Sequence, residues 1–226
     1  MQESPEFERQ QAEGTVPRQP LRHAIRFHRK AIGRGFAISA LGSITYYIGI
    51  TYVPAFLIQA GAMAEGQALW LATSAAVVVI LVTPLVGALS DRFGRKPVLL
   101  ILCGCALLLP AAAFELMATN SLAYALWGAL ILAALGGGVS AVGAVATAEQ
   151  FPGEGRLSGL ALGATAATAV FGGFAPYLTQ RLMEQSDSPF IPGLMIAAVA
   201  LGIFPILLAM PETRPLRPGA QNTKQE

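Results

Sequence analysis

A short charged segment interrupts the apolar sequence between residues 87 and 97. It reads GALSDRFGRKP, so that one acidic residue, Asp91, precedes a group of basic residues that begins at Arg92. A carboxylate there can accept hydrogen bonds from basic side chains or from a helix N-terminus, and Gly87 and Gly94 permit close backbone approach. A charge cluster of this kind can hold two groups of helices together and break when they separate, which predicts a gate with two states.

A second pair of opposite charges, Glu149 and Arg156, lies farther along the chain. The separation would be about two turns of a continuous helix, but Pro152 and Gly153 favour a turn between two helices. We expect this pair and the first charged segment to form one network on the same side of the protein. The residues assigned to this gating network are Gly87, Asp91, Arg92, Gly94, Arg95, Glu149 and Arg156.

The residue groups that common enzymes require are missing from the sequence. It contains no nucleophile with an adjacent base, no metal-ligand cluster and no phosphate-binding loop. His23 and His28 lack a third ligand nearby, and the spacing of Cys103 and Cys105 places them on different sides of a helix. We therefore predict a protein that is not an enzyme and that holds no metal and no cofactor.

The composition places most of the chain in lipid. Hydrophobic residues make up 54% of the 226 residues and charged residues 12%, and the mean hydropathy is +0.56. These values exclude a disordered protein, a disulfide scaffold and an ordinary soluble enzyme. A net charge of +2 is too small to indicate binding to nucleic acid.

Six segments are long and apolar enough to cross a hydrocarbon core of about 30 Å as helices. Their one formal charge, Glu115, lies near the end of the third segment. Since backbone groups in lipid must be satisfied internally, we predict an all-α membrane protein. It has a tail at residues 1–34, a six-helix bundle at 35–210 and a tail at 211–226. The segments are 35–60, 66–89, 98–117, 121–148, 157–180 and 190–210.

Basic residues are almost confined to one side of these segments. Of the fifteen Lys and Arg residues, Arg181 alone falls on the other side. The positive-inside rule therefore places both termini in the cytoplasm. The residues between Pro17 and Arg34 predict a basic interfacial helix that contacts anionic membrane lipids, with a plain topology signal as the alternative.

Prolines and small residues recur within the segments. Five of the six contain an internal proline, which indicates either a bundle that flexes around a path or the ordinary abundance of proline in membrane helices. Small residues at four-residue spacing, such as Gly159 and Gly163, or Gly35 and Ser39, predict close helix contacts within or between chains. The prolines are Pro54, Pro84, Pro110, Pro176 and Pro205.

Three motifs in this order resemble the major facilitator superfamily. GALSDRFGRKP is similar to the G-x-x-x-D-R-x-G-R-[RK] pattern between the second and third helices of each six-helix half. Residues 148–152, with Arg156 and Gly159, resemble the A-E-x-F-P-x-x-x-R-x-x-G passage between helices ten and eleven, and residues 211–214 resemble the PET motif after helix twelve. The resemblance implies helices seven to twelve, one half of a fold built from two inverted three-helix repeats.

Within that superfamily, residues 171–176 and the pattern Tyr47, Tyr52, Pro54 are similar to the metabolite:proton symporters of bacterial inner membranes. Such proteins carry organic acids, betaines or related solutes at the midplane between two six-helix bundles. The resemblance implies an N-terminal-half partner chain or a second copy, with the titratable groups for proton coupling on that other half. Ala164 and Thr165 depart from the family pattern.

The candidate residues for a solute cavity are polar or aromatic and lie in the middle of a span. We assign Tyr46, Tyr47, Thr165 and Thr168 to it, with Thr45 as a further candidate. Tyr47 is the strongest of these, although a tyrosine bonded to a neighbouring helix remains the alternative. The alternative hypothesis for the function of the chain is a truncated or accessory membrane subunit without transport activity.

Overall fold

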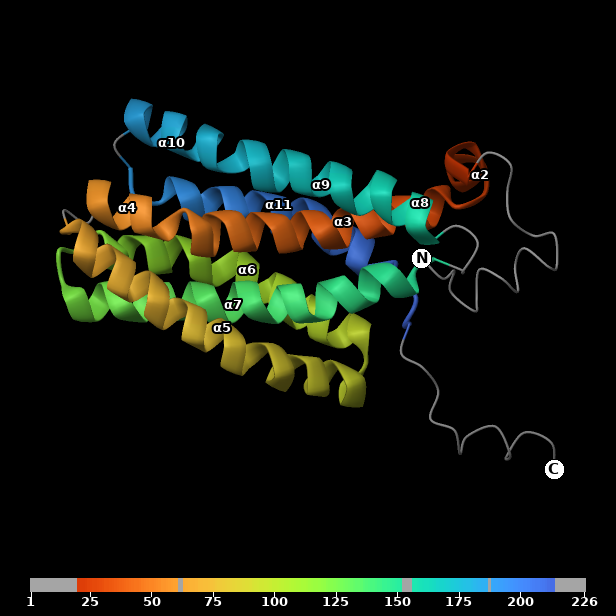
Figure 1. Cartoon of the computed structure of the whole chain (residues 1–226), viewed down its shortest axis with the longest axis horizontal. Helices are drawn as coiled ribbons and strands as arrows, with labels where there is room; N and C mark the ends of the chain where they lie inside the picture. Colours follow the sequence, from red (N-terminus) through yellow and green to blue (C-terminus); the bar gives the residue numbers. More distant parts are fainter. Residues whose placement is uncertain (1–19, 61–62, 152–155, 187, 214–226) are drawn as a thin grey trace, which may run out of the picture.

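The computed structural model describes residues 20–60, 63–151, 156–186 and 188–213. Within these ranges the chain forms helices that run side by side along one axis, and no strand is present (Figure 1). Five helical stretches are long and apolar enough to cross a membrane, and a further pair bent by 42° gives a sixth span if it is counted as one. The predicted all-helical membrane fold is therefore confirmed.

The helices follow one another with short connections. The short helix α2 (Pro20–Phe27) leads into the first span, and the fifth span consists of several consecutive segments. The first span is α3 (Arg29–Tyr46), η1 (Tyr47–Thr51) and α4 (Val53–Gln59); next come α5 (Glu65–Phe93), α6 (Arg95–Met117) and α7 (Leu122–Glu149); the fifth is α8 (Arg156–Leu160), η3 (Ala161–Thr165), α9 (Ala166–Thr168), η4 (Ala169–Phe174) and α10 (Ala175–Ser186); the last is α11 (Ile191–Leu208).

The helices extend beyond some of the predicted apolar segments. Helix α3 begins at Arg29, before the predicted start at residue 35, and α10 ends at Ser186, after the predicted end at residue 180. Apolarity marks the part of a helix that lies in hydrocarbon, whereas a helix continues into polar sequence as long as its backbone hydrogen bonds can form. The boundary predicted between the N-terminal tail and the bundle therefore falls inside α3.

The prolines differ in their effect on the helices. The bend of 42° in the first span directly precedes Pro54, where η1 gives way to α4. Helices α5, α6 and α11 continue through Pro84, Pro110 and Pro205. The fifth span is instead interrupted by two π-helical segments, η3 and η4, which lie before Pro176. Such wider turns in a helix are frequent at functional sites.

Helix α7 is the centre of the bundle. In the apolar 18-residue stretch of α7, 61% is buried inside the protein, whereas the share is 11% in the corresponding stretch of α5. Helix α7 packs against α3, α5 and α6, and α6 packs in turn against α11. An edge-to-face contact between Phe56 and Phe114, with ring centroids 4.9 Å apart, joins α4 to α6 in the core.

Small residues allow several helices to approach closely. A Cβ atom on Gly193 of α11 would collide with the backbone of Ala111 in α6. Gly163 of the predicted small-residue stripe lies against α3, where a Cβ atom would be 2.9 Å from the carbonyl oxygen of Ile32. Contacts of this type rely on dispersion and weak hydrogen bonds between backbones. Gly163 therefore serves a helix contact within this chain.

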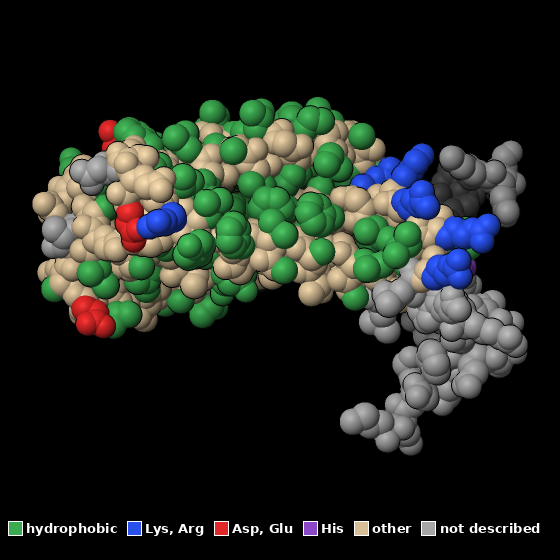
Figure 2. Space-filling model, turned by 90° about the horizontal axis from the view of Figure 1, so that it is seen from above, with side chains coloured by type: hydrophobic (Ala, Val, Ile, Leu, Met, Phe, Trp, Pro, Cys, Tyr) green, Lys and Arg blue, Asp and Glu red, His purple; other side chains and the backbone are tan. Residues whose placement is uncertain are grey.

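Charged side chains gather at the two ends of the bundle and leave its middle apolar (Figure 2). The end formed by α2, the start of α3, the end of α5 and the start of α6 is called the basic end. The other end, with the start of α5 and the end of α10, is called the opposite end. The basic end carries Arg22, Arg26, Arg29, Lys30, Arg34, Arg92, Arg95 and Lys96, and the opposite end carries Glu65, Glu115, Arg181 and Glu184.

Candidate functional site

Arg95 is the centre of a charge cluster at the basic end. Its Nη1 atom lies 2.6 Å from the Asp91 carboxylate and also donates to the Ser90 hydroxyl. Its Nη2 atom lies 3.5 Å from Oε1 of Glu149, at the end of α7. The Arg95 side chain is 8% exposed, whereas Asp91 is 67% exposed. One buried guanidinium thus connects the ends of α5 and α7 to the start of α6.

Glu212, which follows α11, caps the N-terminus of α6. Its two carboxylate oxygens accept hydrogen bonds from the backbone N–H groups of Arg95, at 2.7 Å, and Lys96, at 3.1 Å. A carboxylate at this position satisfies N–H groups that have no partner in the helix and interacts favourably with the helix dipole. Gly94 leaves room for it, because a Cβ atom there would lie 2.5 Å from the Glu212 oxygen.

Two further hydrogen bonds tie the end of α11 into the same region. The Thr213 hydroxyl donates to Oε2 of Glu149 at 2.7 Å. The Lys96 ammonium donates to the carbonyl oxygen of Leu208 at 2.6 Å. The ends of α5, α7 and α11 and the start of α6 therefore meet through charged or charge-assisted hydrogen bonds, which are stronger than neutral ones.

The predicted gating residues have different places in this arrangement. Asp91, Arg95 and Glu149 are brought together, and Gly94 provides the close approach. Gly87 lies about one helical turn before Asp91 in α5, and its carbonyl oxygen accepts a hydrogen bond of 2.8 Å from the Ser90 hydroxyl.

Two other residues, Arg92 and Arg156, belong to the predicted network. The guanidinium of Arg92 lies 5.5 Å from the centre of the Phe93 ring. The side chain of Arg156 lies outside the described part of the structure, so the predicted pair with Glu149 stays a prediction. The capping role of Glu212 was not predicted, although the PET motif contains this residue.

A cavity of about 280 Å³ lies between α3, α7 and the first part of the fifth span. Residues that carry hydroxyl groups line it from three separate spans. The Ser43 and Thr168 hydroxyls are 3.0 Å apart, and they join α3 to α9. Thr147 is 3% exposed, and its hydroxyl has no hydrogen-bond partner among the described residues. The hydroxyl residues that line the cavity are Ser39, Ser43, Ser140, Thr147 and Thr168.

Of the four residues predicted for the solute cavity, Thr168 lines this one. Tyr46 is 41% exposed and lies edge-on to Tyr47, with ring centroids 5.7 Å apart. Tyr47 packs against Gly172 of η4, where a Cβ atom would be 2.7 Å from its ring. Thr165 is exposed. The further candidate Thr45 turns back to its own helix, where its hydroxyl donates to the carbonyl oxygen of Leu41 at 2.8 Å.

Sequence reasoning missed Ser140 and Thr147 as cavity residues. Both lie on α7, whose sequence is so uniformly apolar and small that no face of the helix stands out. Ser39 was noted as part of a small-residue stripe, which is a signal for close packing and equally for a cavity. The hydroxyls on α3 and α7 could have suggested a shared site only if the pairing of these two helices had been known.

A chain of polar contacts lies toward the opposite end. The Tyr52 hydroxyl donates to Oε1 of Gln180 at 2.8 Å, and the Gln180 amide donates to Glu184 at 3.2 Å. Glu184 also lies 3.5 Å from Arg181. Tyr52 is 6% exposed and stands at the bend of the first span. The chain of contacts therefore connects this bend to α10.

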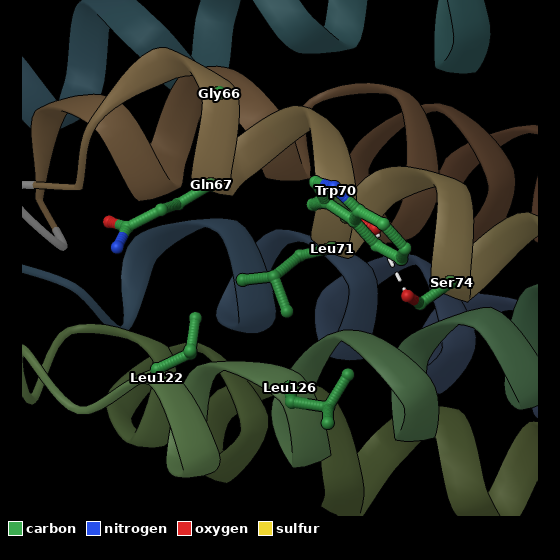
Figure 3. A pocket seen from close by; sticks show the side chains of 7 residues that line it. All are labelled: Gly66, Gln67, Trp70, Leu71, Ser74, Leu122 and Leu126. Atoms are coloured by element: carbon green, nitrogen blue, oxygen red, sulfur yellow. Dashed lines mark hydrogen bonds between the residues drawn. The ribbon is translucent and has the colours of Figure 1, made fainter.

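A groove of about 360 Å³ lies at the opposite end between α5 and α7 (Figure 3). Gln67, Trp70 and Leu71 of α5 face Leu122 and Leu126 of α7 across it. Trp70 is 75% exposed, and aromatic side chains of this kind are enriched where a membrane meets water. Further exposed aromatic residues toward this end are Tyr124, Trp127 and Tyr177.

No group of three or more His, Cys, Asp or Glu side chains within the described ranges could hold a metal ion. Cys103, in the middle of α6, donates its thiol to the carbonyl oxygen of Ala200 in α11 at 3.3 Å. The ring of His23 lies 4.7 Å from that of Phe27 and 5.8 Å from that of His28. These residues therefore take part in helix and ring contacts.

The comparison with known proteins agrees with this architecture. Residues 9–226 match the family model described as Major Facilitator Superfamily. The chain is 30% identical to the ectoine/proline transporter ProP of Corynebacterium glutamicum over 204 residues, which cover 86% of this chain and 40% of that protein. It is 30% identical over 156 residues to the alpha-ketoglutarate permease of Escherichia coli, covering 69% of this chain and 36% of that protein.

A third relative is the citrate-proton symporter of Klebsiella pneumoniae, which is 29% identical over 172 residues that cover 74% of this chain and 38% of that protein. The chain thus spans well under half the length of the curated relatives it matches. A family model that matches nearly the whole chain, together with apolar helices long enough for several membrane crossings, identifies a multi-pass membrane protein that belongs to the major facilitator superfamily.

Proposed function

We propose that this chain is the C-terminal six-helix half of a proton-coupled secondary transporter for small organic solutes of the organic-acid or betaine type. The solute path lies between this bundle and a second six-helix bundle, and access alternates between the two sides of the membrane. The relatives, which include an ectoine/proline transporter and a citrate-proton symporter, support this class of solute.

The single observation that carries the proposal is the arrangement of contacts around Arg95. Four helix ends meet there, and the contacts of α6 with Glu149 and Glu212 would be stretched if α6 moved away from α7 and α11. Such a cluster has two discrete arrangements, intact and broken. In the proposal, the intact cluster holds the basic end in one state, and its opening permits the other.

The hydroxyl-lined cavity supports a solute path along α3 and α7. A hydroxyl both donates and accepts hydrogen bonds, so Ser43 and Thr168 suit carboxylate groups as well as water.

The basic end faces the cytoplasm of a bacterial inner membrane in this proposal. Cationic side chains are retained on the cytoplasmic side of membrane proteins, and here they cluster at one end (Figure 2). Cysteines introduced at Asn120 and at Arg92, in a background with Cys103 and Cys105 replaced by alanine, test this. A membrane-impermeant maleimide applied to intact cells is expected to label residue 120 alone. Labelling of residue 92 alone would contradict the proposed orientation.

Transport is tested by reconstitution into liposomes with an imposed proton gradient. One preparation contains this chain alone, and the other contains it with the six-helix partner that co-purifies with it. Labelled proline, glycine betaine, 2-oxoglutarate and citrate serve as solutes. We expect uptake of at least one of them that collapses with a protonophore, and we expect it only in the second preparation.

A matched pair of variants links uptake to the charge cluster. Asp91→Asn removes a carboxylate that contacts Arg95, and Glu115→Gln removes an exposed carboxylate at the opposite end. The first is expected to slow uptake strongly and the second to leave it unchanged. Proton-coupled uptake by this chain alone contradicts the half-transporter, and absence of uptake in both preparations favours an accessory membrane subunit.

A further inference from the structure

We propose that the segment from Arg22 to Lys30, called the basic surface helix, binds the anionic headgroups of a phospholipid bilayer. This segment comprises most of α2 and the first residues of α3. It lies at the basic end, where Figure 1 shows α2 turned out of the direction of the long helices. The inference concerns an interaction surface and is independent of whether the chain transports a solute.

Within the described ranges, no acidic side chain pairs with the basic side chains of the basic surface helix. Arg22, Arg26, Arg29 and Lys30 are all exposed. The sequence contains no Asp or Glu from residue 14 to residue 64, so α2 and the first span contain no acidic residue. Among the described residues, none of these four side chains forms an ion pair. A concentrated positive surface attracts anionic groups, and salt screens this attraction.

The same helix also exposes apolar side chains. Phe27 is 64% exposed and Ile25 is 47% exposed. Ala24 is fully buried, and α2 contacts both α3 and α8, so the helix is held against the bundle on one side. Its other sides present apolar and basic groups together, with the Arg26 guanidinium 5.6 Å from the centre of the Phe27 ring. This combination is typical of helices that lie between headgroups and acyl chains.

The position of the helix selects a lipid bilayer as its partner. The basic side chains lie just past the edge of the apolar surface of the bundle, which occupies the hydrocarbon core in a membrane (Figure 2). This edge is the level at which phospholipid headgroups are found. A soluble acidic partner would match the charges, but it would leave Ile25 and Phe27 exposed to water. Insertion of these two side chains beside the headgroups accounts both for the basic charge and for the exposed apolar side chains.

The inference predicts a defined sensitivity to charge. Each basic residue near an anionic surface strengthens binding about fivefold. Replacing two of the four should therefore weaken binding of anionic lipid about 25-fold, and high salt should have a similar effect. Both effects should be confined to lipids with anionic headgroups.

The experiment uses the full chain in nanodiscs of phosphatidylcholine alone or with one third phosphatidylglycerol. Hydrogen exchange followed by mass spectrometry reports protection of residues 20–34, and retention of short-chain phosphatidylglycerol by the chain in neutral detergent gives the affinity. We expect protection to rise with phosphatidylglycerol and to fall at high salt. In the double variant Arg22→Gln/Arg26→Gln, protection should no longer rise with phosphatidylglycerol. In the control Arg181→Gln, at the opposite end, protection should rise as in the parent.

A second variant tests the apolar contribution. Ile25→Ser/Phe27→Ser keeps every charge, so it should lower protection by phosphatidylglycerol while the dependence on salt remains. Equal protection in both lipids, an unchanged response of Arg22→Gln/Arg26→Gln, or an equal loss in Arg181→Gln would each overturn the proposal. Protection by added polyglutamate in place of phosphatidylglycerol would overturn it in favour of an acidic protein partner. Because no solute is present, these outcomes are independent of the transport experiment.

Discussion

Glu212 lies so close to Gly94 that a Cβ atom on residue 94 would stand 2.5 Å from its carboxylate oxygen. Gly94 also has φ +109° and ψ 154°, a conformation that only glycine adopts without strain. The residue thus serves the fold in two ways, because it turns the chain sharply between α5 and α6 and leaves room for the carboxylate that caps α6.

Gly94→Ala is expected to destabilise the chain by about 1–3 kcal/mol through backbone strain and displacement of Glu212. The measurement is thermal denaturation in detergent, followed by loss of the monodisperse peak. Gly87→Ala is the matched control, since a Cβ atom there meets nothing within 4 Å and alanine favours a helix. Equal melting temperatures for the two variants would show that the Glu212 cap contributes no stability.

Arg95→Gln is expected to destabilise the chain more than Asp91→Asn. Arg95 is buried and is the partner of Glu149, so its removal leaves a partly buried carboxylate without its cation, at a cost of roughly 1–3 kcal/mol. Asp91 is exposed, and an exposed ion pair contributes less than about 1 kcal/mol. Thermal denaturation of both single variants and the double variant measures their coupling, and strict additivity would indicate that Asp91 acts independently of Arg95.

Thr147→Val tests the buried hydroxyl of the cavity. Valine has nearly the same shape, so the variant should be as stable as the parent or more stable by about 1 kcal/mol, because an unpartnered hydroxyl is removed. Thr179→Val is the control, since the Thr179 hydroxyl donates to Ala175 and its loss should cost stability. A destabilised Thr147→Val chain would indicate that the hydroxyl already has a partner.

Tyr52→Phe should loosen the contact between the bend of the first span and α10. The variant loses the hydrogen bond to Gln180 and should destabilise the chain by about 1 kcal/mol. Hydrogen exchange in α10 is expected to become faster. Tyr46→Phe provides the comparison, because Tyr46 is partly exposed and its described contact is with the Tyr47 ring. If both variants exchange alike, the Tyr52 hydroxyl does not hold α10.

Much of the fold could be predicted from the sequence because the membrane imposes a local requirement. Any stretch that lies in hydrocarbon must be apolar and must form its backbone hydrogen bonds within itself. The spans, their helical structure and the side on which charges lie can therefore be predicted from local sequence. The charged segment at residues 87–97 was predicted to form a cluster, and the structure joins Asp91 and Arg95, at the end of α5 and the start of α6, in an ion pair.

The sites themselves were decided by tertiary structure. Glu212 caps a helix that begins at Arg95, and Thr168 shares a cavity with Ser43 and Thr147, although these residues are far apart in the chain. Which helices become neighbours depends on close packing of small residues such as Gly163 and Gly193, and apolar sequence is too uniform to reveal such pairs. The sequence by itself therefore determined the helices and the ends on which charges lie, and the packing of those helices decided which polar groups meet.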